Sequence, residues 1–424
     1  MQIRNSEIDF GKLVFYTRTK KELTQQELSL GICSITYLSK LENSKIDPNE
    51  ETLALLLKRL DIDIHDIHHN NLDIIQNLEL WYLSIIKRDE PELIEQMKEI
   101  NDSVIKKVYS TDLIFYSYLV KLRYYIHRKK KNEATTVLET LTKSKEKLNQ
   151  HQSAYFTYLH GLYLCTILLD FPKGLEYFEN IIYFFNDPQH EDPEFFYHLS
   201  LTYTKTYNTR MAVTYVEKAL TIFNSKLFFK RSLECQLLLG VNLGRLKEYN
   251  RAIEILTQIT EVAPGLDEKL TFAKALHNLG YLYSKIGRFN EAIDYYLKTL
   301  KYTDSQTDFY LNTIIELSTV LKENNRLKEA KEWIELAFKE YKPSNEQSSK
   351  LIQLKVLEFQ ISQNTHELIN FLENTAIPCF LEINEFGLLS KYYELLGNIY
   401  KRLHQYKKSS YYFESCLHLQ KKMS

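Results

Sequence analysis

Hydrophobic positions at the start of the chain follow the spacing of short amphipathic helices. Leu13, Val14 and Tyr16/Thr17 recur at the i, i+3, i+4 spacing that gathers apolar side chains on one helix face. Thr24 is followed three residues later by Glu27, the capping-box pattern that begins a second helix, TQQELSL. The pattern therefore predicts two short helices before residue 31.

A turn and two further helices follow. Gly31 breaks the second helix and supplies a sharp turn. Ser34 can cap a third helix, SITYLSKLE, in which Leu38 and Leu41 face inward. Pro48 and the acidic residues after it begin a fourth helix, and its segment ETLALLLKRL closes a small core. We interpret residues 1–66 as a helix-turn-helix domain.

Beyond residue 70 the hydrophobic pattern repeats. The clearest unit spans residues 275–300, and related units occupy 236–264 and 392–417. In the first unit, small and aromatic residues stand at the tetratricopeptide spacing: Leu276, Leu279, Gly280, Tyr283, Gly287, Phe289, Ala292 and Tyr296. Weaker copies fill the gaps at a step of about 40 residues, longer than the standard unit of ~34. A degenerate copy over 81–100 would make roughly nine units.

These patterns predict an all-α protein. Glycine (11) and proline (8) are too scarce for the many turns of an all-β fold. We expect a helix-turn-helix bundle over 1–66, a linker over 67–76 and a right-handed tetratricopeptide-type superhelix over 77–424. The concave face of such an array suits a peptide or a protein.

Composition and charge exclude some classes of function. A net charge of −1 excludes a generic polycation, so any contact with DNA must be local and shaped. The five cysteines are scattered without a CxxC pair, and no secretory signal or membrane-length apolar stretch is present, which favours a reduced cytoplasmic compartment. We interpret a His/Asp group within 63–69 as a solvated helix end and the basic run 127–131 as a solvated turn between two helices. We expect no catalytic set, metal or cofactor.

The N-terminal segment resembles the Cro/repressor-type helix-turn-helix family. The resemblance covers roughly residues 8–64 and is carried by the pattern L-T-Q-x-E-L, a Gly, S-x-x-x-[IL]-S-[KR]-[IL]-E and P-x-x-E-T-L. It implies a recognition helix over 34–40 in the major groove, with Arg18 and Glu42 as an internal ion pair. The implied DNA-contacting residues are Gln25, Gln26, Ser34, Ile35, Thr36, Tyr37, Lys40, Asn43 and Lys45.

The segment departs from this family in two respects. The usual Arg or Gln base readers are absent from the recognition helix, and residues 1–66 hold nine Lys/Arg against eleven Asp/Glu. One alternative is a helix-turn-helix kept for protein contacts. A homodimer or higher oligomer would offset the weak charge by doubling the phosphate contacts on double-stranded DNA.

The combination of helix-turn-helix and array resembles the Gram-positive quorum-sensing regulators of the Rap–Rgg–NprR–PlcR–PrgX group. This resemblance implies a short signalling peptide bound inside the superhelix, which alters the oligomer and its affinity for DNA. The concave wall is formed by about the second, fifth, sixth, ninth, twelfth and thirteenth positions of each first helix. The candidate ligand residues there are Arg123, Lys205, Asn242, Arg245, His277, Asn278, Lys285, Asn398 and Arg402.

Two rival functions stay open from the sequence. A Rap-like module would dock a phosphorelay response regulator through the array. A passive repeat scaffold would explain the array and leave the helix-turn-helix unused. A recognition helix with its caps and core positions in place favours DNA binding over both.

Overall fold

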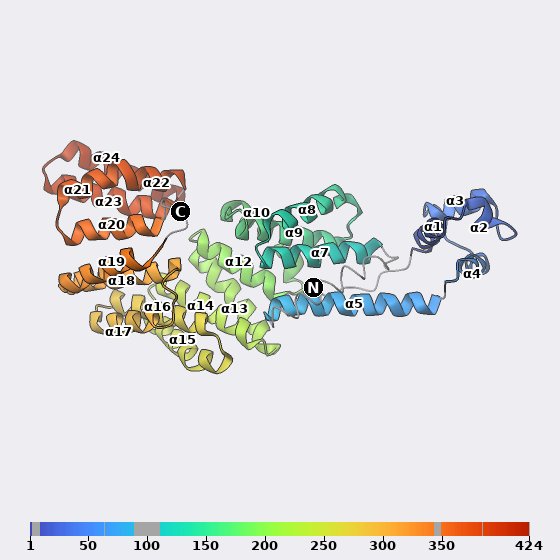
Figure 1. Cartoon of the computed structure of the whole chain (residues 1–424), viewed down its shortest axis with the longest axis horizontal. Helices are drawn as coiled ribbons and strands as arrows, with labels where there is room; N and C mark the ends of the chain where they lie inside the picture. Colours follow the sequence, from blue (N-terminus) through green and yellow to red (C-terminus); the bar gives the residue numbers. More distant parts are fainter. Residues whose placement is uncertain (2–8, 63, 89–110, 343–348, 384, 424) are drawn as a thin grey trace. The chain divides into compact units, whose positions relative to one another are not determined.

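The computed structural model describes residues 1, 9–62, 64–88, 111–342, 349–383 and 385–423. The secondary structure of these residues is helical and contains no strand, which confirms the predicted all-α class (Figure 1). Contacts divide the chain into two compact units, Met1–His198 and Leu199–Ser424. The first unit includes the helix-turn-helix, and each unit contains helical repeats.

Four short helices form the N-terminal domain: α1 (Phe10–Lys20), α2 (Gln25–Ser29), α3 (Ile35–Glu42) and α4 (Glu50–Arg59). The predicted capping box is present, since the Thr24 side chain accepts from Glu27 N–H at 3.1 Å and Glu27 accepts from Thr24 N–H at 2.7 Å. Gly31 has φ +72°, a left-handed conformation that glycine adopts without strain, and it turns the chain from α2 toward α3.

The core of this domain comes from all four helices. Its buried members are all apolar, and the helical spacing predicted most of them: Leu13, Val14, Leu28, Leu38, Leu41, Leu53, Leu56, Leu57 and Leu60. A core this small depends on every member, because a domain of about 60 residues buries only about 60% of the surface that its unfolded chain exposes, less than larger domains do. The arrangement leaves one side of α3 exposed.

A long helix, α5 (Ile64–Lys87), follows α4. The segment 67–76, which we expected as a linker, lies inside this helix. Side chains over 63–71, including the His/Asp group, and the degenerate repeat beyond residue 88 lie outside the described residues. The rest of the first unit contains α7 (Thr111–His127), α8 (Lys131–Lys143), α9 (Gln150–Thr166), α10 (Phe171–Glu179) and α11 (Ile182–Asn186). The basic run 127–131 forms the turn between α7 and α8, as predicted.

One helix, α12 (Pro193–Lys205), crosses the boundary between the two units. The second unit continues with α13 (Thr209–Ser225), α14 (Phe229–Arg245), α15 (Tyr249–Val262), α16 (Lys269–Lys285), α17 (Phe289–Leu300), α18 (Asp308–Glu323), α19 (Leu327–Glu340), α20 (Ser349–Ile361), α21 (Thr365–Phe371), α22 (Ile377–Glu382), α23 (Phe386–Arg402) and α24 (Tyr406–Met423). Helices α14 and α15, α16 and α17, α18 and α19, and α23 and α24 form contacting pairs. A single π-helical turn, Leu372–Ala376, joins α21 to α22.

The first helices of successive pairs contact one another, α14 with α16, α16 with α18 and α18 with α20. Together with α23 they line what we call the inner face, which is concave in solenoids of this type. Within some of the pairs a glycine lets the two helices approach closely. The position of an added Cβ on Gly280 would lie 2.9 Å from the Tyr296 ring, and one on Gly397 would lie 2.9 Å from Phe413.

Gly280→Val is therefore expected to destabilise the second unit by about 1–3 kcal/mol, since the fully buried Tyr296 ring has no room to retreat. Urea unfolding followed by circular dichroism measures the change. Gly265→Val is the control, because an added Cβ at Gly265 would have no neighbour within 4 Å. Equal losses in both variants would contradict this account of the close approach.

Candidate nucleic-acid interface and ligand-binding face

An internal ion pair fixes the helix-turn-helix. Arg18 donates through Nε to Glu42 Oε1 at 2.6 Å and through Nη2 to Oε2 at 2.9 Å, and Nη1 donates to the Leu23 carbonyl at 2.8 Å. The Glu42 side chain is 2% exposed. Its carboxylate therefore depends on this bidentate partner. Gln25 also donates to Glu42 Oε2 at 2.7 Å, which ties this predicted phosphate contact to the interior.

The predicted recognition helix, α3, presents a face that is mostly polar and includes one exposed apolar side chain, Ile35. Ser34 caps α3 by accepting from Tyr37 N–H at 3.1 Å, and Ile35 and Thr36 are exposed on the first turn. Tyr37 is half-buried, and its hydroxyl accepts from Asn49 N–H at 2.9 Å, so it also fastens α3 to the start of α4. The remaining predicted contacts are exposed: Gln26, Lys40, Asn43 and Lys45.

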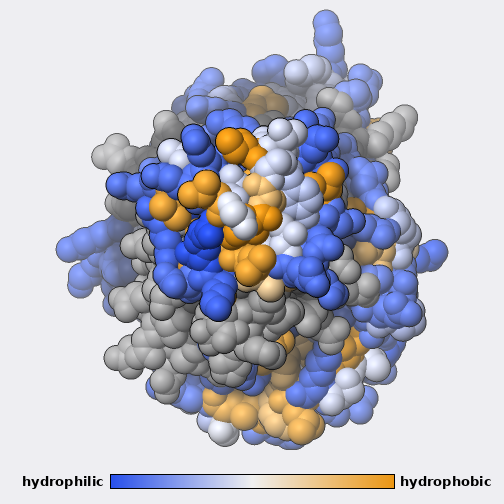
Figure 2. Space-filling view, turned by 90° about the vertical axis from the view of Figure 1, so that its right-hand side faces the viewer, coloured by the Kyte–Doolittle hydropathy of each residue, from blue (hydrophilic) through white to orange (hydrophobic). Residues whose placement is uncertain are grey.

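Figure 2 looks toward the end of Figure 1 at which α1–α4 are drawn. On this face a small group of hydrophobic side chains lies among hydrophilic ones. The exposed large hydrophobic residues of α1–α4 are Phe15, Leu30, Ile35 and Leu55. Ile35 is the one on the recognition helix, where an apolar side chain can contact a thymine methyl.

On the inner face of the second unit, a depression of about 260 Å³ lies among α14, α15, α16 and α18. It is lined by Gly240, Val241, Arg245, Leu256, His277, Asn278, Tyr281, Leu282 and Glu316. Three of the predicted ligand residues, Arg245, His277 and Asn278, thus come together there. The structure brings them to one place because each stands on a first helix at the inner face.

Neighbouring residues hold two of these three side chains in place, and each keeps polar atoms that these contacts do not use. Arg245 donates from Nη1 to the Thr204 carbonyl at 2.6 Å, and its guanidinium lies 5.3 Å from the centre of the Tyr207 ring. Asn278 donates from Nδ2 to the Lys274 carbonyl at 2.8 Å, which leaves its amide oxygen as an acceptor. Pre-positioned side chains of this kind lose little freedom when they bind.

His277 is committed to the fold. Its Nε2 accepts from the Asn312 amide at 3.3 Å, so the proton resides on Nδ1, which lies 3.1 Å from Thr313 Oγ1. Burial, with a smaller contribution from Lys350, lowers the pKa of His277 to about 4. The imidazole is therefore neutral at ordinary pH.

Acid is expected to weaken the second unit through His277. The folded chain keeps this imidazole neutral down to about pH 4, whereas the unfolded chain binds a proton near pH 6.5. Stability attributable to His277 therefore falls as pH drops from 6.5 toward 4, by up to roughly 1.4 kcal/mol per pH unit. Hydrogen exchange of α16 and α18 amides at about pH 7.5 and 5 checks this. The decline should be shallower in His277→Gln, and an equal decline would contradict the assignment.

Three polar residues at or near the depression were not predicted from the sequence: Asn312, Glu316 and Lys350. Glu316 lines it directly, and Lys350 donates to the Asn312 amide oxygen at 2.8 Å. A signal was available, because with Ser318 at the eighth position of its repeat, Asn312 and Glu316 occupy the second and sixth positions. Both are positions that line the concave wall.

Other predicted ligand residues lie apart from the depression. Arg123, in the first unit, is buried and pairs with Glu194 at 2.8 Å. Asn242 is fully buried and donates to Thr204 Oγ1 and the Leu238 carbonyl, both at 2.8 Å. Because both side chains are buried and already paired, the prediction that Arg123 and Asn242 contact a ligand is corrected: they support the fold. The remaining predicted residues, Lys205, Lys285, Asn398 and Arg402, are exposed, and Lys285 lies 5.1 Å from the Tyr281 ring centre.

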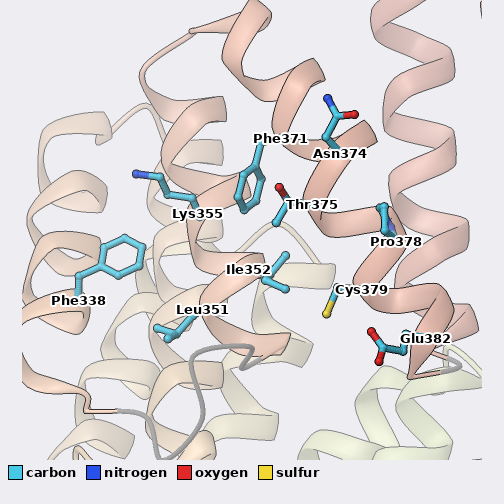
Figure 3. Close-up of a pocket in the computed structure, with 10 residues that line it drawn as sticks. All are labelled: Phe338, Leu351, Ile352, Lys355, Phe371, Asn374, Thr375, Pro378, Cys379 and Glu382. Carbon is cyan, nitrogen blue, oxygen red and sulfur yellow. The ribbon is translucent and has the colours of Figure 1, made fainter.

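A second depression, of about 510 Å³, lies among α19, α20 and the α21–α22 segment. Figure 3 shows Phe338 on one side, Pro378 and Glu382 on the other, and Ile352 and Phe371 between them. Lys355 at its edge is paired with Glu358 at 2.7 Å. Its apolar walls and its paired cation give no indication of a particular ligand.

Two kinds of site are absent from the part of the chain that the structure describes: metal sites and membrane-spanning helices. The described residues contain no group of three or more His, Cys, Asp or Glu side chains placed to hold a metal ion. Nor does any helix among them combine the length and the apolar character needed to span a bilayer.

Two family models match this chain, one in the helix-turn-helix and one in the repeats. Residues 16–67 match the helix-turn-helix family model, and residues 275–307 match a tetratricopeptide repeat model. The chain is 27% identical over 410 residues to the transcriptional activator NprA of Geobacillus stearothermophilus, covering 93% of this chain and 98% of that protein. The chain thus has the domain composition of a repeat-containing helix-turn-helix regulator.

Two solved structures and one further relative are similar to this chain over most of its length. The apo form of the quorum sensor NprR from B. thuringiensis superposes with a TM-score of 0.72 at 25% identity, over 82% of this chain and 99% of that one. NprR in complex with its cognate peptide NprX gives a TM-score of 0.65 at 26% identity, over 82% and 98%. The response regulator aspartate phosphatase H of Bacillus subtilis is 22% identical over 71% of this chain and 85% of its own length. Along most of its length the chain is therefore similar in sequence and fold to NprR, and more distantly in sequence to a Rap protein.

Proposed function

We propose that this protein is a peptide-responsive transcription regulator. It binds operator DNA through α3 and a short signalling peptide on the inner face of its repeat array. The observation that carries the proposal is the similarity to an activator along 93% of the chain, which includes both the helix-turn-helix and the repeats. The peptide part is supported by the structural likeness to NprR, which binds its cognate peptide NprX.

The DNA-binding part has local support in this chain. The α3 face carries exposed Thr36 and Lys40, while the buried Arg18–Glu42 pair keeps the domain in shape beneath it. Because residues 1–66 have a net negative charge, one domain would bind phosphates weakly. We therefore propose that the working form is a homodimer, which places two recognition helices on one site.

We assign the protein to the cytoplasm, where its DNA is, and give it no catalytic activity. A ligand shifts DNA binding only if it prefers one conformation of the protein to another. The peptide should therefore change the arrangement of the two helix-turn-helix domains in the dimer. Whether it promotes or releases DNA binding is read directly from the experiment below.

A genome-wide DNA pull-down with the purified full chain tests the proposal. It is run with and without synthetic versions of the peptides encoded next to the gene of this protein. We expect specific sites whose occupancy changes with one peptide. No enriched site under either condition would contradict the regulatory function.

A second candidate function rests on the similarity to response regulator aspartate phosphatase H. In that case the array would dock a response regulator. A pull-down of purified response regulators with the full chain separates the two, since a DNA-dedicated regulator retains none of them. A retained response regulator together with empty DNA would favour this second function.

A further inference from the structure

Two charged side chains on the inner face lie partly buried without an ion-pair partner. Glu316 on α18 is half-buried at the edge of the 260 Å³ depression. Lys350 at the start of α20 is also half-buried, and its ammonium donates to the neutral Asn312 amide. Among the ion pairs within 4.0 Å formed by described residues, neither Glu316 nor Lys350 takes part. A desolvated charge without a partner is costly, so such a group in a folded protein needs an explanation.

No cation among the described residues lies within ion-pair distance of the Glu316 carboxylate. Burial raises the pKa of its carboxyl, against the lowering effect of Lys391, Lys285 and Lys350 at longer range and with a small raising effect from Glu323. Lys285 and Lys391 are exposed, and solvent and salt weaken their effect over such distances. The carboxylate therefore still lacks a close donor, and it faces a depression that can admit one.

The chemistry of the depression defines what would bring that donor. Its apolar part is formed by Val241, Leu256 and Leu282, which suit one apolar side chain. Its polar rim holds Asn278, with a free amide oxygen for a peptide N–H, and Glu316. An apolar side chain, a main-chain donor and a cation placed next to one another fit a short peptide.

We propose that Glu316 is the subsite for a positively charged group of the peptide. That group is either the N-terminal ammonium or a Lys or Arg side chain, and the adjacent apolar side chain fills the depression. The proposal rests on the proposed function, because it names the charge of the peptide that the regulator reads. Binding then replaces an unpaired, partly desolvated carboxylate by a charge-assisted hydrogen bond.

Synthetic hexapeptide pools test the subsite on the full-length protein. In each pool one position is fixed as Lys, Gln or Glu, and every pool is made with a free and with an acetylated N-terminus. Fluorescence-detected binding to the wild type should favour one cationic arm by about 10- to 100-fold over the matched neutral arm. A preference for fixed Lys identifies a side chain, and loss on acetylation identifies the N-terminal ammonium.

Variants at this position separate a binding role from a structural one. Glu316→Gln should lose the cationic preference, and Glu316→Lys should transfer it to the Glu pools. Glu323→Gln, on the same helix and exposed, is the matched control and should keep the wild-type preference. Urea unfolding of Glu316→Gln should show stability equal to or above that of the wild type, since an unpaired carboxylate is removed.

The outcomes distinguish the inference from the function on which it rests. If no pool binds the wild type, the proposed peptide binding itself fails. If pools bind but show no preference for a cation, or if Glu316→Gln keeps that preference, the subsite is wrong while peptide binding stands. A large loss of stability in Glu316→Gln would show that the carboxylate has a structural partner, which also overturns the proposal.

Discussion

Arg18→Met is expected to destabilise the helix-turn-helix by about 3–5 kcal/mol and to abolish specific DNA binding. The substitution leaves Glu42 with its carboxylate buried, 2% exposed, and without the guanidinium that satisfies both oxygens. Removing one partner of a buried pair carries this cost because the remaining charge stays desolvated. The carbonyl of Leu23, a residue in the segment between α1 and α2, loses its hydrogen-bond donor as well.

Hydrogen exchange of α1–α4 amides in the full chain measures this effect. Lys21→Met is the matched control, since it breaks the exposed Lys21–Asp61 pair in the same domain and should cost at most about 1 kcal/mol. The double variant Arg18→Met with Glu42→Leu should recover most of the protection, because no charge is then left buried. Protection equal to the wild type in the single variant would refute the structural role of this pair.

Thr36→Glu is expected to lower specific DNA affinity at least 100-fold without unfolding the domain. Thr36 is exposed on the first turn of α3, so a glutamate there adds no packing strain. In the proposed complex the glutamate places a negative charge near the phosphate backbone in each half-site. Because a dimer binds two half-sites, the unfavourable electrostatic free energy is doubled. A loss of about 1.4 kcal/mol per half-site already gives the 100-fold effect.

Quantitative binding to sites recovered in the pull-down, measured at several salt concentrations, checks this prediction. Thr214→Glu is the control: Thr214 is an exposed threonine in the middle of a helix of the repeat array, outside the proposed DNA contact. It should leave affinity and salt dependence unchanged. Unaltered binding by Thr36→Glu would show that α3 does not enter the groove, and would favour a helix-turn-helix kept for protein contacts.

Much of the local structure was predictable because it depends on neighbouring residues. The capping box at Thr24 and the Ser34 cap use side chains within three residues of the backbone they serve, and the left-handed turn at Gly31 depends only on that residue's own backbone. The contact between Gly280 and Tyr296 follows a fixed repeat spacing, so it too was readable. The continuity of α5 through 67–76 was missed, since a polar, weakly periodic stretch gives no clear helix signal.

The candidate ligand site could be predicted only in part from the sequence. Repeat register placed Arg245, His277 and Asn278 on the inner face, and the structure brings them to one depression. Register alone gave no sign that Asn242 is fully buried against Thr204 or that Arg123 is paired with Glu194. Those pairings join residues 38 and 71 positions apart, so they depend on how helices pack.

The sequence by itself determined the all-α class, the helix-turn-helix and the repeat pairs, because period, caps and small-residue spacing are local properties. Only the tertiary structure decided which polar side chains have partners. It placed Gln25 against Glu42, set His277 in a neutral hydrogen-bonded position and left Glu316 partly buried without an ion pair. Burial and pairing are set by segments distant in the chain, and they decide whether a charged residue supports the fold or awaits a ligand.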